Sequence, residues 1–161
     1  MSVSPDGFRS AMGHLVAGVT VVAIKDDAGR AYGMTASAVS SLSLEPPMVL
    51  ACIDRSATIH DLLVRSRAFS ISILAEDQAE LAQRFADPAR HQFADAAGPD
   101  GPAGPLGLPV VAGALAHLEC TRGRVHDGGD HSIITATVEW ARTQAGAPLC
   151  HFQSSYARLA R

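Results

Sequence analysis

The first eighteen residues carry an apolar stripe with the spacing of one helix face. Its members are Phe8, Ala11, Met12 and Leu15, which follow one another at i, i+3, i+4 and i+7. Ser4 precedes Pro5, and this pair is typical of a helix N-cap followed by the first helical position. The pattern therefore predicts a helix that begins at Pro5 and ends near Gly18.

Most of the remaining chain has the two-residue period of β-strands. The period is clearest where Phe69, Ile71 and Ile73 alternate with serines. A dense β-branched run at 19–24 is typical of a buried strand. The predicted strands cover residues 19–24, 31–40, 48–53, 69–73, 114–125, 133–140 and 149–153.

Two further short helices and two hairpins are predicted between these strands. Ser56 is placed as the N-cap of a helix that ends near Ser66, and Glu76 begins a helix that ends near Phe85. Turn residues separate pairs of strands at 26–29 and 127–130. Because strands do not alternate regularly with helices, we expect a mainly β, antiparallel barrel with peripheral helices, not a doubly wound sheet.

Length and composition fit one globular domain. Of 161 residues, 47% are hydrophobic and 18% are charged, so we expect residues 1–161 to form a single domain. Thirteen Lys and Arg against sixteen Asp and Glu give a net charge of −3, which argues against a nucleic-acid-binding protein. The longest stretch without charged side chains, 101–118, is broken by prolines, so no transmembrane segment is expected.

The cysteines and the N-terminus indicate a cytoplasmic protein. Cys52, Cys120 and Cys150 are odd in number, widely spaced and without a C-x-x-C pair. Reduced thiols are the simplest interpretation. No basic region precedes the first apolar run, so a secretory signal is not expected.

Residues 87–111 form a long segment without clear periodicity. Glycine recurs within it at every third position, at Gly98, Gly101, Gly104 and Gly107. These triplets are too few for a collagen helix. We therefore expect a Gly/Pro-rich loop at 98–109, whose role the pattern leaves open.

The familiar motifs for nucleotide binding, nucleophilic catalysis and zinc hydrolysis do not occur in the sequence. His126 and His131 could meet across the 127–130 turn and hold a metal with Asp127 or Asp130. A further close ligand is missing, so surface turn residues are the preferred interpretation and no metal is predicted.

Residues 33–47 are rich in small side chains and hydroxyls and end at a double proline. Small residues let backbone N–H groups approach a ligand, and hydroxyls with amides bind phosphate without much positive charge. Arg55-Ser56, at a predicted helix start, offers a second place for an anion. A polar strand and loop is the alternative interpretation.

Several segments, taken in order, resemble the short-chain flavin reductase family, the reductase components of two-component flavin-dependent monooxygenases. The resemblance covers nearly the whole chain and includes GMTASA at 33–38, CIDRS at 52–56 and GDH at 129–131. The other matching segments are residues 8–13, 18–22, 39–47, 69–74, 81–86, 118–120, 148–149 and 156. The order and spacing of these segments carry the resemblance more than any single motif.

The resemblance implies a split β-barrel that pairs into a homodimer, with FMN or FAD near the dimer interface. It implies that His131 is the catalytic residue on the nicotinamide side and that Arg84 lies near the flavin phosphate. The implied cofactor-binding residues are Thr35, Ala36, Ser37, Ala38, Ser40, Ser41, Cys52, Ile53, Asp54, Arg55, Ser56, Arg84, Phe85 and Tyr156. Ser37 stands where many members have Asn, and Ala38-Val39 replaces a common Ser-Phe pair, so the choice of flavin stays open.

The resemblance implies hydride transfer from NADH, or alternatively NADPH, to FMN or FAD, with the reduced flavin passing to a partner monooxygenase. The missing acid–base machinery agrees with this, because the flavin carries the chemistry and the protein aligns the two rings. Two alternatives stay open. One is an enzyme with tightly bound flavin that reduces another small acceptor, and the other is a non-catalytic flavin-binding protein.

Overall fold

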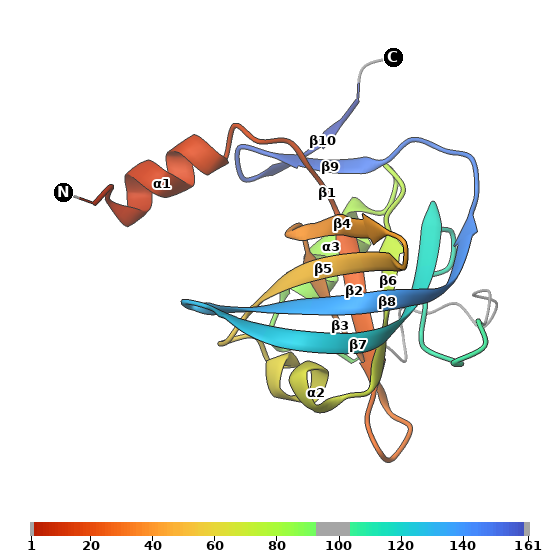
Figure 1. The fold of residues 1–161 in the computed structure, drawn as a ribbon. Coiled ribbons are helices and arrows are strands. Elements are labelled where there is room, and N and C mark those ends of the chain that lie inside the picture. The colour runs from red at the N-terminus through yellow and green to blue at the C-terminus, as the bar shows by residue number, and fades with distance from the viewer. Residues whose placement is uncertain (1, 93–103, 160–161) are drawn as a thin grey trace.

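The protein, described by a computed structural model over residues 2–92 and 104–159, is built mainly of β-strands (Figure 1). The helices are α1 (Pro5–Met12), α2 (His60–Arg65) and α3 (Ala79–Ala86). The strands are β1 (Ala17–Gly18), β2 (Thr20–Lys25), β3 (Ala31–Ala36), β4 (Val39–Leu44), β5 (Pro47–Asp54), β6 (Ala68–Ile73), β7 (Ala116–Gly128), β8 (His131–Thr143), β9 (Leu149–Phe152) and β10 (Ser155–Arg158). Within the described residues, no helix is long and apolar enough to cross a membrane.

Seven strands pair antiparallel in the order β3-β2-β6-β7-β8-β5-β4. Strands β1, β9 and β10 form a smaller antiparallel sheet at one end of the molecule (Figure 1). Strands β3 and β4 end the larger sheet and do not pair with each other, so the barrel is split there. The expected mainly β, antiparallel split barrel with peripheral helices is confirmed.

Strand β2 is buried on both faces. Val22 and Ile24 pack in the barrel core with Phe69, while Val21 and Ala23 pack in a second cluster with residues of α3. Successive side chains of a strand point to opposite faces. A strand covered on both sides therefore appears as a continuous apolar run, which is the pattern at 19–24.

Helix α1 begins where predicted and ends earlier. The Ser4 hydroxyl accepts a hydrogen bond from a first-turn amide at 3.1 Å. The helix ends at Met12, with Gly13 as its C-cap, so the end predicted near Gly18 is wrong. The Gln153 amide donates to the Gly13 carbonyl at 2.9 Å. The turn between β9 and β10 therefore meets the end of the helix, and the chain continues as strand β1.

Three other boundaries differ from the predicted ones. Ser56 does not cap α2, because its hydroxyl donates to Asp54 Oδ1 at 2.8 Å and the helix begins four residues later. Helix α3 starts three residues after Glu76, beyond a turn. The predicted strand 31–40 is two strands, β3 and β4, separated by two residues. Strands β1 and β10 were not predicted, since such short segments show too little alternation.

Residues 104–111 lie against the sheet and are anchored by a buried carboxylate. Glu119 in β7 is fully buried. Its oxygens accept hydrogen bonds from the Leu106 amide at 2.6 Å and the Leu108 amide at 2.9 Å. A buried charge is stabilised when such donors satisfy it, so Glu119 fixes this segment to the barrel.

The predicted 98–109 loop is irregular from residue 104 onwards, and residues 98–103 lie outside the described residues. A Cβ atom on Gly104 would lie 2.4 Å from Glu119 Oε2. Glycine at this position therefore lets the loop approach the carboxylate closely.

Replacing Glu119 by Gln tests this anchor. The Gln side chain offers one accepting oxygen and a donating NH₂ group, so one of the two amides loses its acceptor. We expect the free energy of unfolding to fall by about 2 kcal/mol, as for a lost hydrogen bond to a charged group. Urea denaturation measures this change. The exposed Glu139→Gln control should change stability by less than about 0.5 kcal/mol, and equal losses for the two variants would contradict the anchor.

Candidate active site

The pairing of β5 with β8 brings two predicted segments together. Asp54 pairs with His131, and Cys52 pairs with Ile133. The β7–β8 hairpin turns through Gly129, whose φ of 76° lies in the left-handed region that glycine adopts readily. His131 is therefore held at the start of β8, beside the end of β5.

A cavity of about 960 Å³ opens between α1, the hairpin tip and the β9–β10 region. Four predicted site residues line it, namely Ser37, Ala38, Cys52 and His131. The other lining residues are Pro5, Phe8, Arg9, Met12, Gly13, Leu15, Ala17, Gly128, Asp130, Ile133, His151 and Ser154. A mostly apolar wall with a few polar groups is typical of cofactor sites.

A second cavity, of about 210 Å³, lies at the end of β5. Its predicted lining residues are Thr35, Asp54, Ser56 and Phe85. The others are Met34, Ala57, Thr58, Ile59, Ala86, Asp87, Pro88 and His91. Cys52 and Asp54 are two positions apart in β5, so their side chains share one face of the strand. The two cavities therefore follow one another along β5.

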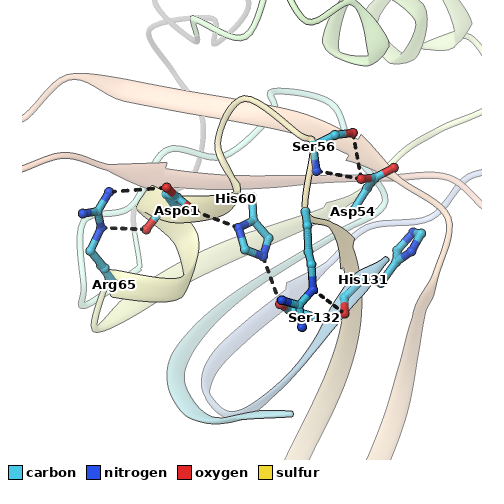
Figure 2. A network of polar contacts seen from close by, with 8 residues as sticks. Asp54, Ser56, His60, Asp61, Arg65, His131 and Ser132 are labelled. Atoms are coloured by element: carbon cyan, nitrogen blue, oxygen red, sulfur yellow. Dashed lines mark hydrogen bonds and ion pairs between the residues drawn. The ribbon is translucent and has the colours of Figure 1, made fainter. Parts of the chain in front are cut away.

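Asp54 gives the smaller cavity a negative charge. Its Oδ1 atom accepts hydrogen bonds from the Ser56 amide at 2.7 Å and the Ser56 hydroxyl at 2.8 Å (Figure 2). These bonds, the backbone one first, lower the pKa of Asp54 below its usual value, with smaller contributions from the charges of His131 and His60. The carboxyl group is therefore ionised at neutral pH.

Arg55 is directed toward the hairpin. Its Nε donates to the His131 carbonyl at 3.3 Å, and its guanidinium forms an ion pair with Asp127. Its backbone amide donates to the Asp130 carbonyl at 2.9 Å. Arg55 therefore ties the end of β5 to the hairpin that carries His131, and it is not among the described residues that line either cavity.

Several predicted residues lie beside the cavities without lining them. Ile53 is fully buried in the barrel core, and Ala36, 8% exposed, packs in the same core. Ser40 and Ser41 lie exposed on the edge strand β4. The hydroxyl of Thr35, a lining residue of the small cavity, donates to an α3 carbonyl at 2.6 Å. The structure thus does not bring the stretch 35–41 together as one surface.

The last predicted residues lie at the two ends of the site. Arg84, on α3, borders a groove of about 570 Å³ with Arg90 and two carboxylates. Tyr156, on β10, meets the His151 ring edge-on with centroids 6.0 Å apart. Partial burial raises the pKa of Tyr156. Tyr156 thus contacts the large cavity through His151.

Sequence reasoning missed the contribution of α1 to this site. Phe8 and Met12 of α1, and Leu15 shortly after it, line the large cavity, although they are 57%, 46% and 65% exposed. The signal was the apolar stripe itself, because α1 buries none of its residues within the chain. His151 was also missed, and no local pattern marks it.

The structure gives no support to a metal site formed by His126 and His131 on the hairpin. His126 pairs with Ile133 across the hairpin, not with His131. Among the residues that the structure describes, no group of three or more His, Cys, Asp or Glu side chains could hold a metal ion.

The fold and the two cavities define a class of protein, the antiparallel split barrel with two neighbouring cavities along one strand. Residues 12–160 match the family model described as flavin reductase like domain. The chain belongs to this family, as its sequence motifs predicted.

Relatives and solved structures agree with this assignment. The chain is 41% identical over 149 residues to the reductase component of a 4-nitrophenol 4-monooxygenase/4-nitrocatechol 2-monooxygenase from Rhodococcus opacus, covering 92% of this chain and 78% of that protein. It is 38% identical over 154 residues to an FMN reductase (NADH) from Agrobacterium fabrum, covering 96% and 86%. A Streptomyces globisporus NADH:FAD oxidoreductase in complex with NAD and FAD fragments superimposes with a TM-score of 0.88 at 34% identity, covering 99% and 97%.

The three thiols should differ sharply in reactivity if Cys52 lines the ligand site. Burial, helped by the charges of Glu139 and Glu119, raises the pKa of Cys120 to about 12, so its unreactive protonated form persists at pH 8. Cys150 is also buried. We expect a thiol reagent to modify Cys52 first in the folded protein, as read by mass spectrometry.

Added FMN or FAD should slow Cys52 modification at least about fivefold, because a bound ring covers the cavity wall. Cys52→Ser is the control and should abolish the fast phase. Modification of Cys52 at the same rate with saturating flavin would contradict its place in the flavin site.

Proposed function

We propose that this protein is an NADH:flavin oxidoreductase that reduces FMN or FAD and releases the reduced flavin to a partner monooxygenase. The observation that carries the proposal is the pair of cavities along β5, with His131 among the residues that line the larger one. The relatives named above as reductases support it, as does family membership over nearly the whole chain.

The residues present fit a flavin. The large cavity offers apolar side chains from α1 for a planar ring system. In the adjoining small cavity a phosphate would have to take the Ser56 hydroxyl from its hydrogen bond to Asp54. Arg84 lies on α3, on the outer side of the same region, where its charge favours a phosphate. The negative Asp54 beside Ser56 opposes tight phosphate binding, which suits a flavin that has to leave.

The reaction requires little acid–base catalysis by the protein's own side chains. When bound, the flavin supplies the two-electron chemistry by accepting a hydride from NADH, which leaves as NAD⁺. The protein aligns the two rings and excludes water. In this proposal His131, which lines the large cavity and whose Nδ1 lies 2.7 Å from Asp130 Oδ1, contacts the nicotinamide.

Three further features complete the proposal. Residues 1–161 act as one flavin reductase domain, supported by the family match from 12 to 160. The protein works in the cytoplasm, where its three unpaired cysteines stay reduced. It uses NADH in preference to NADPH, since the relatives named with a nicotinamide act on NADH.

The test is NADH consumption by the purified protein with no flavin, with FMN and with FAD, in air and without a partner. Turnover that rises and saturates with flavin supports the proposal, and the same curves identify the preferred flavin. Flavin binding by fluorescence quenching without NADH oxidation would refute the reductase function and leave a binding protein.

His131→Ala should act mainly on the nicotinamide. We expect KM for NADH to rise about tenfold, the loss of roughly one hydrogen bond, with the flavin dissociation constant within about twofold of wild type. His126→Ala, an exposed histidine on the same hairpin, is the matched control and should leave both constants unchanged. A collapse of flavin binding with unchanged KM for NADH would reverse the assignment.

The protein forms a homodimer in this proposal, with α1 at the interface. Helix α1 buries none of its residues within the chain, and an eight-residue helix is marginal by itself in water. The apolar side chains of its stripe are exposed, as are Leu42 and Leu44 of β4, and apolar surface of this kind marks an interaction site when it is contiguous. A second copy of the chain is the occupant that family membership favours.

Sedimentation analysis tests the dimer. Wild type should sediment at twice the 16.8 kDa chain mass. Phe8→Asp with Met12→Asp should sediment as a monomer, because two charges would be buried in the interface. Ser10→Asp, on the same helix outside the apolar stripe, should remain dimeric. A wild-type mass of one chain would contradict the proposal.

A further inference from the structure

A buried polar contact joins α2 to the strand that carries His131. His60 Nε2 lies 2.9 Å from Ser132 Oγ, and His60 Nδ1 lies 3.0 Å from Asp61 Oδ1 (Figure 2). An ionised Asp61 only accepts, so in the neutral imidazole Nδ1 carries the proton and Nε2 accepts from the Ser132 hydroxyl. The contact is shielded, because Ser132 is 4% exposed and the His60 side chain 12% exposed.

Ser132 lies between two residues that line the large cavity. His131 and Ile133 both contribute to its wall. Side chains alternate along a strand, so Ser132 points away from the cavity toward α2, where His60 meets it. The hydrogen bond between His60 and Ser132 therefore fixes the backbone of β8 on the side away from the cavity, and this backbone carries His131 and Ile133.

The other side-chain contacts at this point are exposed to solvent. Arg55 donates to the His131 carbonyl, and Asp130 contacts the His131 ring. Arg55 also pairs with Asp127, and their side chains are 48% and 83% exposed. Water and salt screen exposed pairs of this kind, and they contribute little. A hydrogen bond shielded from water holds its geometry better. The His60–Ser132 bond is therefore the shielded side-chain contact beside His131.

The same three side chains have the residue types of a hydrolase triad, but the geometry does not serve that chemistry. The Ser132 hydroxyl is buried, so a substrate carbonyl has no access to it. Asp61 is the residue next to His60 on a surface helix and is 79% exposed. The contact holds structure and does not attack a substrate.

We propose that His60 is a positioning residue for His131, acting through its hydrogen bond to Ser132. The expected effect on KM for NADH rests on the proposed function. The expected effect on the position of the strand rests on the geometry alone. Displacement of a substrate-contacting group by about 1 Å can cost up to about 100-fold in rate. We expect a smaller effect here, since β5 still pairs with β8 when the bond is lost.

The kinetic test compares His60→Ala, His60→Gln and Ser132→Ala. His60→Ala and Ser132→Ala should each raise KM for NADH about 5- to 20-fold, with the flavin dissociation constant within about twofold of wild type. The double variant should be no worse than either single one, because both remove the same bond. His60→Gln should recover most of the loss, since its amide reaches Ser132. Arg65→Ala, which removes only the exposed partner of Asp61, is the matched control and should behave as wild type.

Hydrogen exchange of the hairpin tests the same contact without activity. Amides of residues 130–133 should exchange faster in His60→Ala and Ser132→Ala than in wild type and Arg65→Ala. If wild type does not oxidise NADH, the proposed function fails while this measurement still decides the positioning role. Wild-type exchange in both variants, or a lowered melting temperature with unchanged KM for NADH, would overturn the inference. If His60→Ala does not fold, His60→Gln and Ser132→Ala carry the comparison.

Discussion

The antiparallel register of β5 and β8 is the constraint on which the site depends. It sets Cys52 opposite Ile133 and Asp54 opposite His131. A slip of one residue would turn every side chain of β5 to the other face, so Cys52 and Asp54 would enter the core. The barrel core prevents the slip, because Ile53 is fully buried between them. The packing of the barrel thus fixes the site, and the polar contacts around the hairpin refine it.

Much of the fold could be predicted from the sequence because its strands follow simple burial rules. The run at 19–24 indicated a strand covered on both faces, and β2 is one. The predictions failed where local chemistry permits two outcomes. Ser56 is a good N-cap by type, yet its hydroxyl bonds to Asp54 instead. Strands as short as β1 and β10 hold too few residues to show a period, so only tertiary pairing reveals them.

The candidate site residues were predicted through family resemblance and only partly through physical pattern. Motif matching selects contiguous residues, whereas alternate residues of a strand face opposite sides. For this reason the residues of the stretch 52–56 have different surroundings. Cys52, Asp54 and Ser56 line the cavities, whereas Ile53 lies in the core. Arg55 bonds to the hairpin that carries His131. His151 is brought to the site from the other sheet, and no local pattern encodes that approach. The apolar stripe of α1 was evident in the sequence, but α1 buries none of its residues in the described part of the chain.

The polar groups buried in this protein serve geometry more than chemistry. Glu119 fixes a loop, and Ser132 fixes the strand beside His131. This division suits a reaction in which the two substrates supply the reactivity and the protein supplies alignment. It also separates one side of the large cavity, made by β5 and β8, from the side made by α1, which buries none of its residues in the described part of the chain. A ligand held against the α1 side can leave without disturbing the barrel. In the proposed function, α1 therefore governs flavin release, while β5 and β8 align the two rings.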